Sequence, residues 1–166
     1  MTTVTVQGNP IRIRGTLPEP GSRAPDFRLV DTGLRVRTLA DFAGRRKVIS
    51  IVPSLDTDVC AAQARRFNEE ARALDNTVVL VVSADLPFTQ ARFRREQGTD
   101  DVVPLSTVRS PGFGQAYGVL VDEGPVAGTC ARAVIVVDEQ DVVRHAQLVP
   151  EIDDEPDYAA ALAALR

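Results

Sequence analysis

The fold is decided by the stretch VISIVPSLDTDVC, residues 48–60, which continues as AAQARRF over residues 61–67. The apolar run at 48–52 predicts a buried strand, and the run after Cys60 predicts a helix. Cys60 is therefore expected in the first turn of a helix that leaves the carboxyl end of a strand. Thr57 or Asp58 is the expected N-cap of that helix.

The predicted position of Cys60 has a chemical consequence. Free backbone N–H groups and the positive end of the helix dipole would surround its sulfur. These groups favour the thiolate, which is the reactive form of cysteine. The alternative is that Cys60 is a small apolar residue that buries the start of the helix, as free cysteine often does. Its position in the sequence does not separate the two readings.

The residues around Cys60 shift the balance between these readings. Pro53, Thr57 and Cys60 form the pattern P-x-x-x-T-x-x-C, which resembles the peroxidatic motif of the peroxiredoxins. The wider stretch SLDTDVCAAQARRFNEEA resembles the thiol peroxidase subfamily, the atypical two-cysteine group. Further segments resemble the same subfamily in the same order, among them PGSRAPDFRLVD, DNTVVLVVSADLPFTQARF and VPEIDDEPDYAAALAAL. The resemblance covers nearly the whole chain.

The resemblance implies a fold and a set of catalytic residues. The expected fold is an α/β, thioredoxin-like peroxiredoxin sandwich with an N-terminal β-hairpin, in a single domain over residues 1–166. Cys60 would be the nucleophile, and Arg132, in the segment CARAV, would be the active-site arginine. The hydroxyl of Thr57 can accept a hydrogen bond from the peroxide while donating elsewhere, and Pro53 offers an apolar wall without a donor.

Two readings of Arg132 follow from the residues alone. It begins a strongly apolar strand, where a charge is costly unless it is paired. The alternative is an ordinary strand-end arginine whose charged group reaches solvent. The resemblance favours the paired, catalytic reading.

The chain departs from the subfamily at the resolving cysteine. That cysteine is expected directly after a phenylalanine in the helix that follows SADLPF, but here Phe93 is followed by Arg94. After reaction with peroxide, a Cys60 sulfenic acid must find another thiol. An external thiol could resolve it, Cys130 could substitute, or the protein could turn over poorly and use Cys60 oxidation as a signal.

Cys130 has two readings of its own. It lies two residues before Arg132, so in a regular strand both side chains would point to one face, about 7 Å apart along the strand. A disulfide needs Cα atoms within about 7 Å of each other. A disulfide from Cys130 to a cysteine beside Arg132 would therefore be at the limit of this distance. The other reading is a small buried residue at the start of a strand.

Composition and charge exclude several classes of protein. A chain of 166 residues is expected to form one domain, and its net charge of −4 argues against a nucleic acid partner. The first residues do not resemble a signal peptide, and no apolar run approaches the ~20 residues of a membrane span. We therefore expect a cytoplasmic protein. Its two cysteines and one histidine, His145, are too few for a zinc site, and no cofactor is expected.

Hydrophobic patterning predicts the order of the elements. Residues 3–7 and 11–14 alternate as in a hairpin with one exposed face. The expected helices run from Cys60 onward, from Pro87 towards Gly98, over 113–117 and over 159–165. Strands are expected at 27–30, 34–37, 48–52, 78–82, 102–105, 133–137 and 142–148. Strand–helix–strand units followed by a hairpin and a terminal helix indicate an α/β sandwich.

Three functions remain to be compared. The first is a thiol-dependent peroxidase that reduces hydrogen peroxide and organic hydroperoxides through a Cys60 sulfenic acid, resolved by thioredoxin or a low-molecular-weight thiol. The second is a peroxide sensor or redox relay in which Cys60 oxidation signals to a partner without sustained turnover. The third, a structural module with an unreactive Cys60, is disfavoured by the motif together with Arg132. The resemblance also implies a homodimer with its interface close to the active site.

Overall fold

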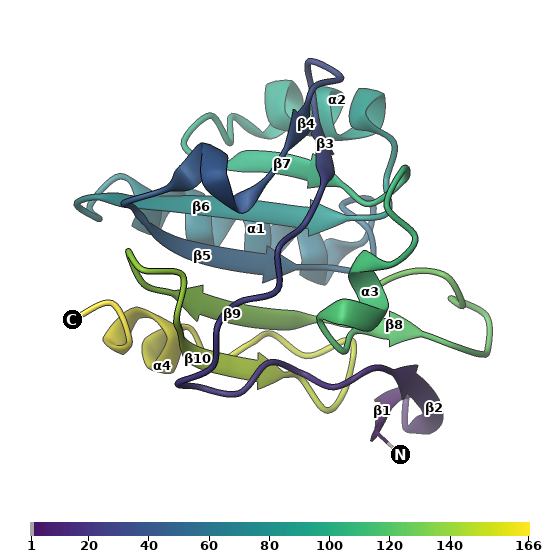
Figure 1. The fold of residues 1–166 in the computed structure, drawn as a ribbon. Coiled ribbons are helices and arrows are strands. Elements are labelled where there is room, and N and C mark those ends of the chain that lie inside the picture. Colours follow the sequence, from purple (N-terminus) through teal and green to yellow (C-terminus); the bar gives the residue numbers. More distant parts are fainter. Residues whose placement is uncertain (1) are drawn as a thin grey trace.

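A seven-stranded sheet, in the order β10-β9-β5-β6-β7-β3-β4, forms the centre of the computed structural model, which describes residues 2–166 (Figure 1). Strands β5, β6 and β7 are parallel, and β9 pairs antiparallel with β5. The strands of this sheet are β3 (Leu29–Asp31), β4 (Val36–Arg37), β5 (Arg46–Ile51), β6 (Thr77–Ser83), β7 (Val103–Ser106), β9 (Ala133–Val137) and β10 (Val143–Leu148).

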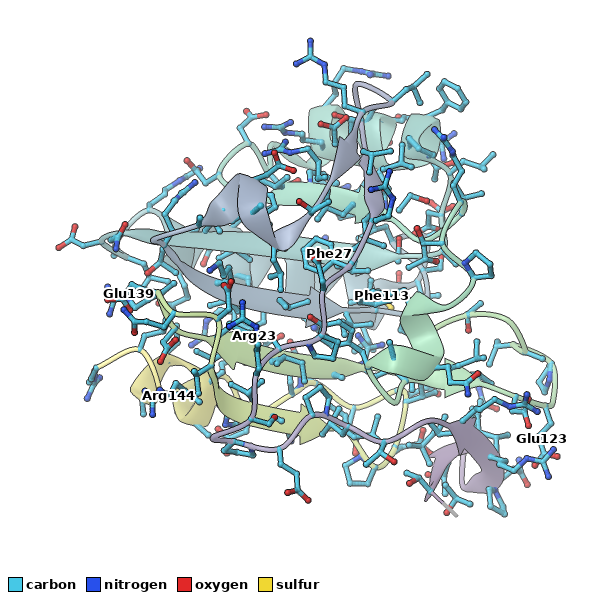
Figure 2. All side chains as sticks on the ribbon, in the orientation of Figure 1. Arg23, Phe27, Phe113, Glu123, Glu139 and Arg144 are labelled. Carbon is cyan, nitrogen blue, oxygen red and sulfur yellow. The ribbon has the colours of Figure 1, made fainter. Side chains whose placement is uncertain are left out.

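Helices cover both faces of the sheet. They are the 3-10 turn η1 (Leu39–Phe42) and the α-helices α1 (Asp58–Ala71), α2 (Pro87–Gln97), α3 (Phe113–Ala116) and α4 (Tyr158–Ala163). In Figure 1, α1 lies behind β5 and β6, whereas α3 lies in front of the sheet. Figure 2 shows Phe27 and Phe113 together on the front face, where their ring centroids are 6.3 Å apart.

Each central strand contributes to two hydrophobic cores because its side chains alternate between the faces. In β5, Ile49 belongs to the core beneath η1 and α3, and Val48 belongs to the core beneath α1, α2 and α4. Strands β6 and β9 alternate in the same way. The unbroken apolar runs of the sequence therefore reflect a sheet that is buried on both faces.

The N-terminal hairpin forms a separate small sheet. Strands β1 (Thr2–Val6) and β2 (Asn9–Arg14) are joined by Gln7 and Gly8, which have φ angles of 51° and 82°. Positive φ at both central residues is the requirement of a tight hairpin turn. A third strand, β8 (Leu120–Val121), pairs with β2 and was not predicted, because two residues carry no readable period.

The predicted α/β sandwich with an N-terminal hairpin is confirmed. Helix α2 begins at Pro87 and ends before Gly98, whose φ of 65° suits the left-handed conformation at a helix end. Among residues 2–166, no helix has both the length and the apolar character needed to cross a membrane.

Candidate active site

The register of the sheet brings Cys60 and Arg132 to the same end of the molecule. Strand β5 ends at Ile51, and the chain then turns through the residues before α1. Ile51 pairs with Ala133 of the antiparallel strand β9, so Arg132, directly before β9, lies beside that turn. Cys60 is the third residue of α1, in the first turn of the helix, as predicted.

Cys60 and Arg132 are in direct contact. The Nη2 of Arg132 donates to the sulfur of Cys60 over 3.2 Å. Cys60 is 0% exposed and Arg132 is 2% exposed, so water screens this contact little. A fixed positive charge and the positive end of a helix dipole both stabilise a thiolate over a thiol. The geometry therefore suits a nucleophilic sulfur.

Two further contacts hold the guanidinium in place, and the sequence did not predict them. The Nη1 of Arg132 donates to Oε1 of Gln63 over 2.9 Å, and its Nε donates to the carbonyl of Ile152 over 2.9 Å. Gln63 in turn donates to the hydroxyl of Ser50 over 2.7 Å. One signal was available for Gln63: it lies three residues after Cys60, on the same face of the helix.

Thr57 and Pro53 lie in the turn between β5 and α1. Thr57 has the backbone position of the N-cap, but its side chain does not cap the helix. Its hydroxyl donates instead to the carbonyl of Ser54 over 3.0 Å, which leaves lone pairs on an exposed oxygen. Pro53 is buried and has no N–H to offer. Both positions are compatible with the predicted roles.

A carboxylate outside the P-x-x-x-T-x-x-C motif anchors this turn. Asp85, between β6 and α2, accepts from the hydroxyl of Ser54 and the backbone N–H of Leu55, each over 2.8 Å. It also accepts from the hydroxyl of Ser83 over 2.7 Å. Asp85 thus ties the turn that leads into α1 to the end of the neighbouring strand.

The prediction that Cys130 and Arg132 share one face is wrong. Cys130 belongs to the core that contains Phe113 and Tyr117, on the opposite face of the sheet from Cys60. The regular strand begins only at Ala133, and Cys130 instead forms an isolated bridge with Leu120. Burial raises the pKa of the Cys130 thiol to about 12. The sheet therefore separates the two cysteines.

Arg94 occupies the position where the subfamily resemblance led us to expect a thiol. It lies in the last turn of α2, where a positive charge complements the helix dipole. Its Nη2 donates to the carbonyl of Asp100 over 3.1 Å. Helix α2 therefore offers no cysteine to Cys60, and Arg94 stabilises the end of the helix.

Comparisons with known proteins agree with this geometry. The Redoxin family model matches residues 19–162. This chain belongs to the Redoxin family. It is 45% identical over 166 residues to the thiol peroxidase of Leptospira interrogans serogroup Icterohaemorrhagiae serovar copenhageni, covering 99% of this chain and 97% of that protein. The subfamily resemblance seen in the sequence is thereby confirmed.

Solved structures match the redoxin chain over almost its whole length. A peroxiredoxin-like protein from Aquifex aeolicus superposes with a TM-score of 0.93 at 37% identity, covering 99% of this chain and 96% of that one. The thiol peroxidase from Chromobacterium violaceum gives a TM-score of 0.89 at 28% identity, covering 98% and 94%. The predicted thioredoxin-like, peroxiredoxin fold is confirmed.

Proposed function

We propose that residues 1–166 form one peroxiredoxin domain that reduces hydrogen peroxide and organic hydroperoxides at the sulfur of Cys60. The observation that carries this proposal is the 3.2 Å contact between the guanidinium of Arg132 and that sulfur. Redoxin membership and the 45% identical thiol peroxidase support a peroxiredoxin-type enzyme. The predicted thiol-dependent peroxidase activity is therefore favoured over a structural role.

In the first step, the Cys60 thiolate attacks one oxygen of the hydroperoxide. An S–O bond forms while the O–O bond breaks, and the sulfur is oxidised to a sulfenic acid. The second oxygen leaves as an alkoxide or hydroxide, which takes up a proton to become an alcohol or water. Negative charge moves from sulfur to the departing oxygen, so fixed donors that face both atoms lower the barrier.

The surrounding groups fit this transfer of charge. The guanidinium of Arg132, in contact with the sulfur, favours the thiolate form that attacks the peroxide. The free N–H groups in the first turn of α1 can donate to the peroxide oxygens. The Thr57 hydroxyl already donates to Ser54, so its oxygen is free to accept from the peroxide O–H. Pro53 leaves this wall of the site without a donor that would hold competing water.

The second step needs a thiol from outside the chain. Cys130 packs on the other face of the sheet, and Arg94 stands where a resolving cysteine was expected. An external thiol, thioredoxin or a low-molecular-weight thiol, attacks the sulfenic sulfur and releases water, leaving a mixed disulfide. A second thiol then reduces this disulfide and restores Cys60.

The setting of this activity is part of the proposal. We place the enzyme in the cytoplasm, where a pool of reduced thiols is available.

We also propose a homodimer whose interface lies beside the catalytic turn. Three exposed apolar side chains at this end of the molecule support it: Leu86, Phe88 and Val108. Sedimentation of the wild type and of Phe88→Ser tests the dimer, which the substitution should weaken.

One experiment tests the enzymatic proposal directly. Peroxide consumption is followed in single-turnover and steady-state assays, with thioredoxin, with a small thiol and with neither. We expect many turnovers with at least one reductant, retention of activity in Cys130→Ala and complete loss in Cys60→Ser. Full activity in Cys60→Ser would rule the mechanism out.

The same assay separates the enzyme from a peroxide sensor. A sensor consumes one equivalent of peroxide and then stops under every reductant, whereas an enzyme continues. The comparisons do not favour the sensor, because the 45% identical relative is a thiol peroxidase. A stop after one equivalent would reverse that preference.

A further inference from the structure

The charge balance around Arg132 is unusual for a buried arginine. Its acceptors are the carbonyl of Ile152, the amide oxygen of Gln63 and the sulfur of Cys60, and none of these is a carboxylate. None of the ion pairs found in residues 2–166 includes Arg132. A buried cation without an anion is costly. A thiolate at Cys60 would supply the anion that relieves this cost.

Gln63 is the neutral partner that makes this balance possible. It is 0% exposed, and a buried amide must satisfy both its donor and its acceptor. Arginine has only donors, so the side that faces Arg132 must be the amide oxygen. The amide nitrogen faces the hydroxyl of Ser50, which is also 0% exposed, over 2.7 Å.

We propose that Gln63, oriented by Ser50, is a positioning residue that aims the guanidinium of Arg132 at Cys60 without neutralising it. This inference rests on the proposed chemistry at Cys60. Three nitrogens of the guanidinium each have one fixed acceptor, which determines its plane. Since the Gln63 oxygen carries no net charge, the positive charge remains available to the sulfur. A glutamate would hold the arginine as well but would compete with the thiolate.

The alternative is that Gln63 only fills and satisfies the core. The two readings predict different results for Gln63→Glu. This substitution keeps the size of the side chain and its acceptor towards Arg132, and the Ser50 hydroxyl can donate to the carboxylate. A purely structural role predicts an unchanged reactivity of Cys60. The positioning role predicts a less reactive sulfur in a protein that is equally or more stable, because the new carboxylate pairs with Arg132.

The chain provides a matched control. Gln97, at the end of α2, accepts from Nη1 of Arg65 over 3.1 Å through its Oε1. Gln97→Glu therefore makes the same chemical change beside an arginine, but on the exposed surface and away from Cys60. Any effect of a new glutamate next to a guanidinium in general appears in this variant too.

The test is the rate of Cys60 alkylation by iodoacetamide at pH 7, which requires no peroxidase turnover, together with thermal melting. We expect Gln63→Glu to slow alkylation by about tenfold or more, with no loss of melting temperature. Gln97→Glu should react as the wild type does. Wild-type alkylation in a folded Gln63→Glu protein overturns the inference.

Two further variants keep the test decisive if Gln63→Glu does not fold. Gln63→Met has a side chain of similar volume to glutamine but lacks the amide oxygen that accepts from Arg132. Ser50→Ala keeps Gln63 but removes the hydroxyl that accepts from its amide nitrogen. Both should slow alkylation, Ser50→Ala by less, and unchanged rates in both contradict the proposal. A wild type that alkylates rapidly but consumes no peroxide would instead contradict the proposed function and leave this inference standing.

Discussion

At the scale of single residues, the two thiols of the chain differ in environment. Burial raises the pKa of Cys130 to about 12. At pH 8 only roughly one Cys130 in ten thousand would then be a thiolate. We expect iodoacetamide to label Cys60 alone in the native protein and both cysteines in denaturant, as measured by mass spectrometry. Labelling of native Cys130 at the rate of Cys60 would contradict the assigned environment.

The residues of the site differ in how well the sequence alone could predict them. Pro53, Thr57 and Cys60 are predictable because they belong to one contiguous motif, and Arg132 follows from family resemblance. Gln63 was missed because its role depends on a contact with a residue 69 positions away along the chain. This contact joins α1 to the residue directly before β9, and no local sequence pattern reports which distant segments meet.

At the scale of elements, Asp85 holds the turn between β5 and α1. Asp85→Ala leaves the N–H of Leu55 and the hydroxyl of Ser54 without their acceptor. Unmet donors of this kind cost about 1–3 kcal/mol, so we expect that loss in urea unfolding. Peroxide reduction should also slow, because the turn that carries Thr57 loosens.

A control for Asp85 lies in the same turn. Asp56 is exposed, and its one ion pair within residues 2–166 is a distant one with Arg92, at 3.7 Å. Exposed pairs contribute about 0–1 kcal/mol, so Asp56→Ala should leave stability and activity nearly unchanged. Equal effects of Asp56→Ala and Asp85→Ala would show that Asp85 has no special role.

The N-terminal hairpin also supports the site, through the residues that follow β10. Thr5 exchanges backbone hydrogen bonds with this segment, donating to Pro150 over 2.8 Å and accepting from Ile152 over 2.9 Å. Ile152 supplies the carbonyl that holds Nε of Arg132. Glu151, between them, accepts from the N–H of Gly8 in the hairpin turn over 2.8 Å.

The hydrogen bond from Gly8, followed by that from Asp153, lowers the pKa of Glu151. A carboxyl with a lowered folded-state pKa stabilises the fold above its unfolded value of about 4.3, and this contribution is lost as pH falls through the folded value. We therefore expect Glu151→Gln to melt at a lower temperature than the wild type at pH 7. The difference should shrink below about pH 4, and a difference that grows there would contradict this assignment.

The prediction of elements succeeded where the pattern was long. The runs that became β5, β6 and α1 were predicted within a few residues, because burial on two faces or on one helical face leaves a clear signal. The hairpin turn lies at Gln7 and Gly8, whereas the predicted strands at 3–7 and 11–14 left residues 8–10 for it. Strand β8 is defined by its pairing with the distant strand β2, and no local pattern reports that pairing.

At the scale of the whole molecule, the site and the ion pair of a buried lysine lie at opposite ends of β5. Lys47, the second residue of this strand, is fully buried, and its Nζ pairs with Oδ1 of Asp141. The catalytic turn follows the other end of the strand. Stability and chemistry should therefore be separable by mutation.

The last prediction uses this separation. Asp141 has a φ of 63°, which asparagine also tolerates, so Asp141→Asn removes the charge without straining the backbone. Breaking a buried pair on one side costs about 3–5 kcal/mol, whereas replacing both charges is often nearly neutral. We expect Asp141→Asn to lose stability in that range in guanidinium unfolding. Lys47→Met should lose much less, because the carboxylate that it leaves unpaired, on Asp141, is partly exposed to water whereas Lys47 is not. Each folded variant should keep the wild-type rate with peroxide. If Lys47→Met costs as much as Asp141→Asn, the pair itself stabilises the fold and the argument from an uncompensated charge fails.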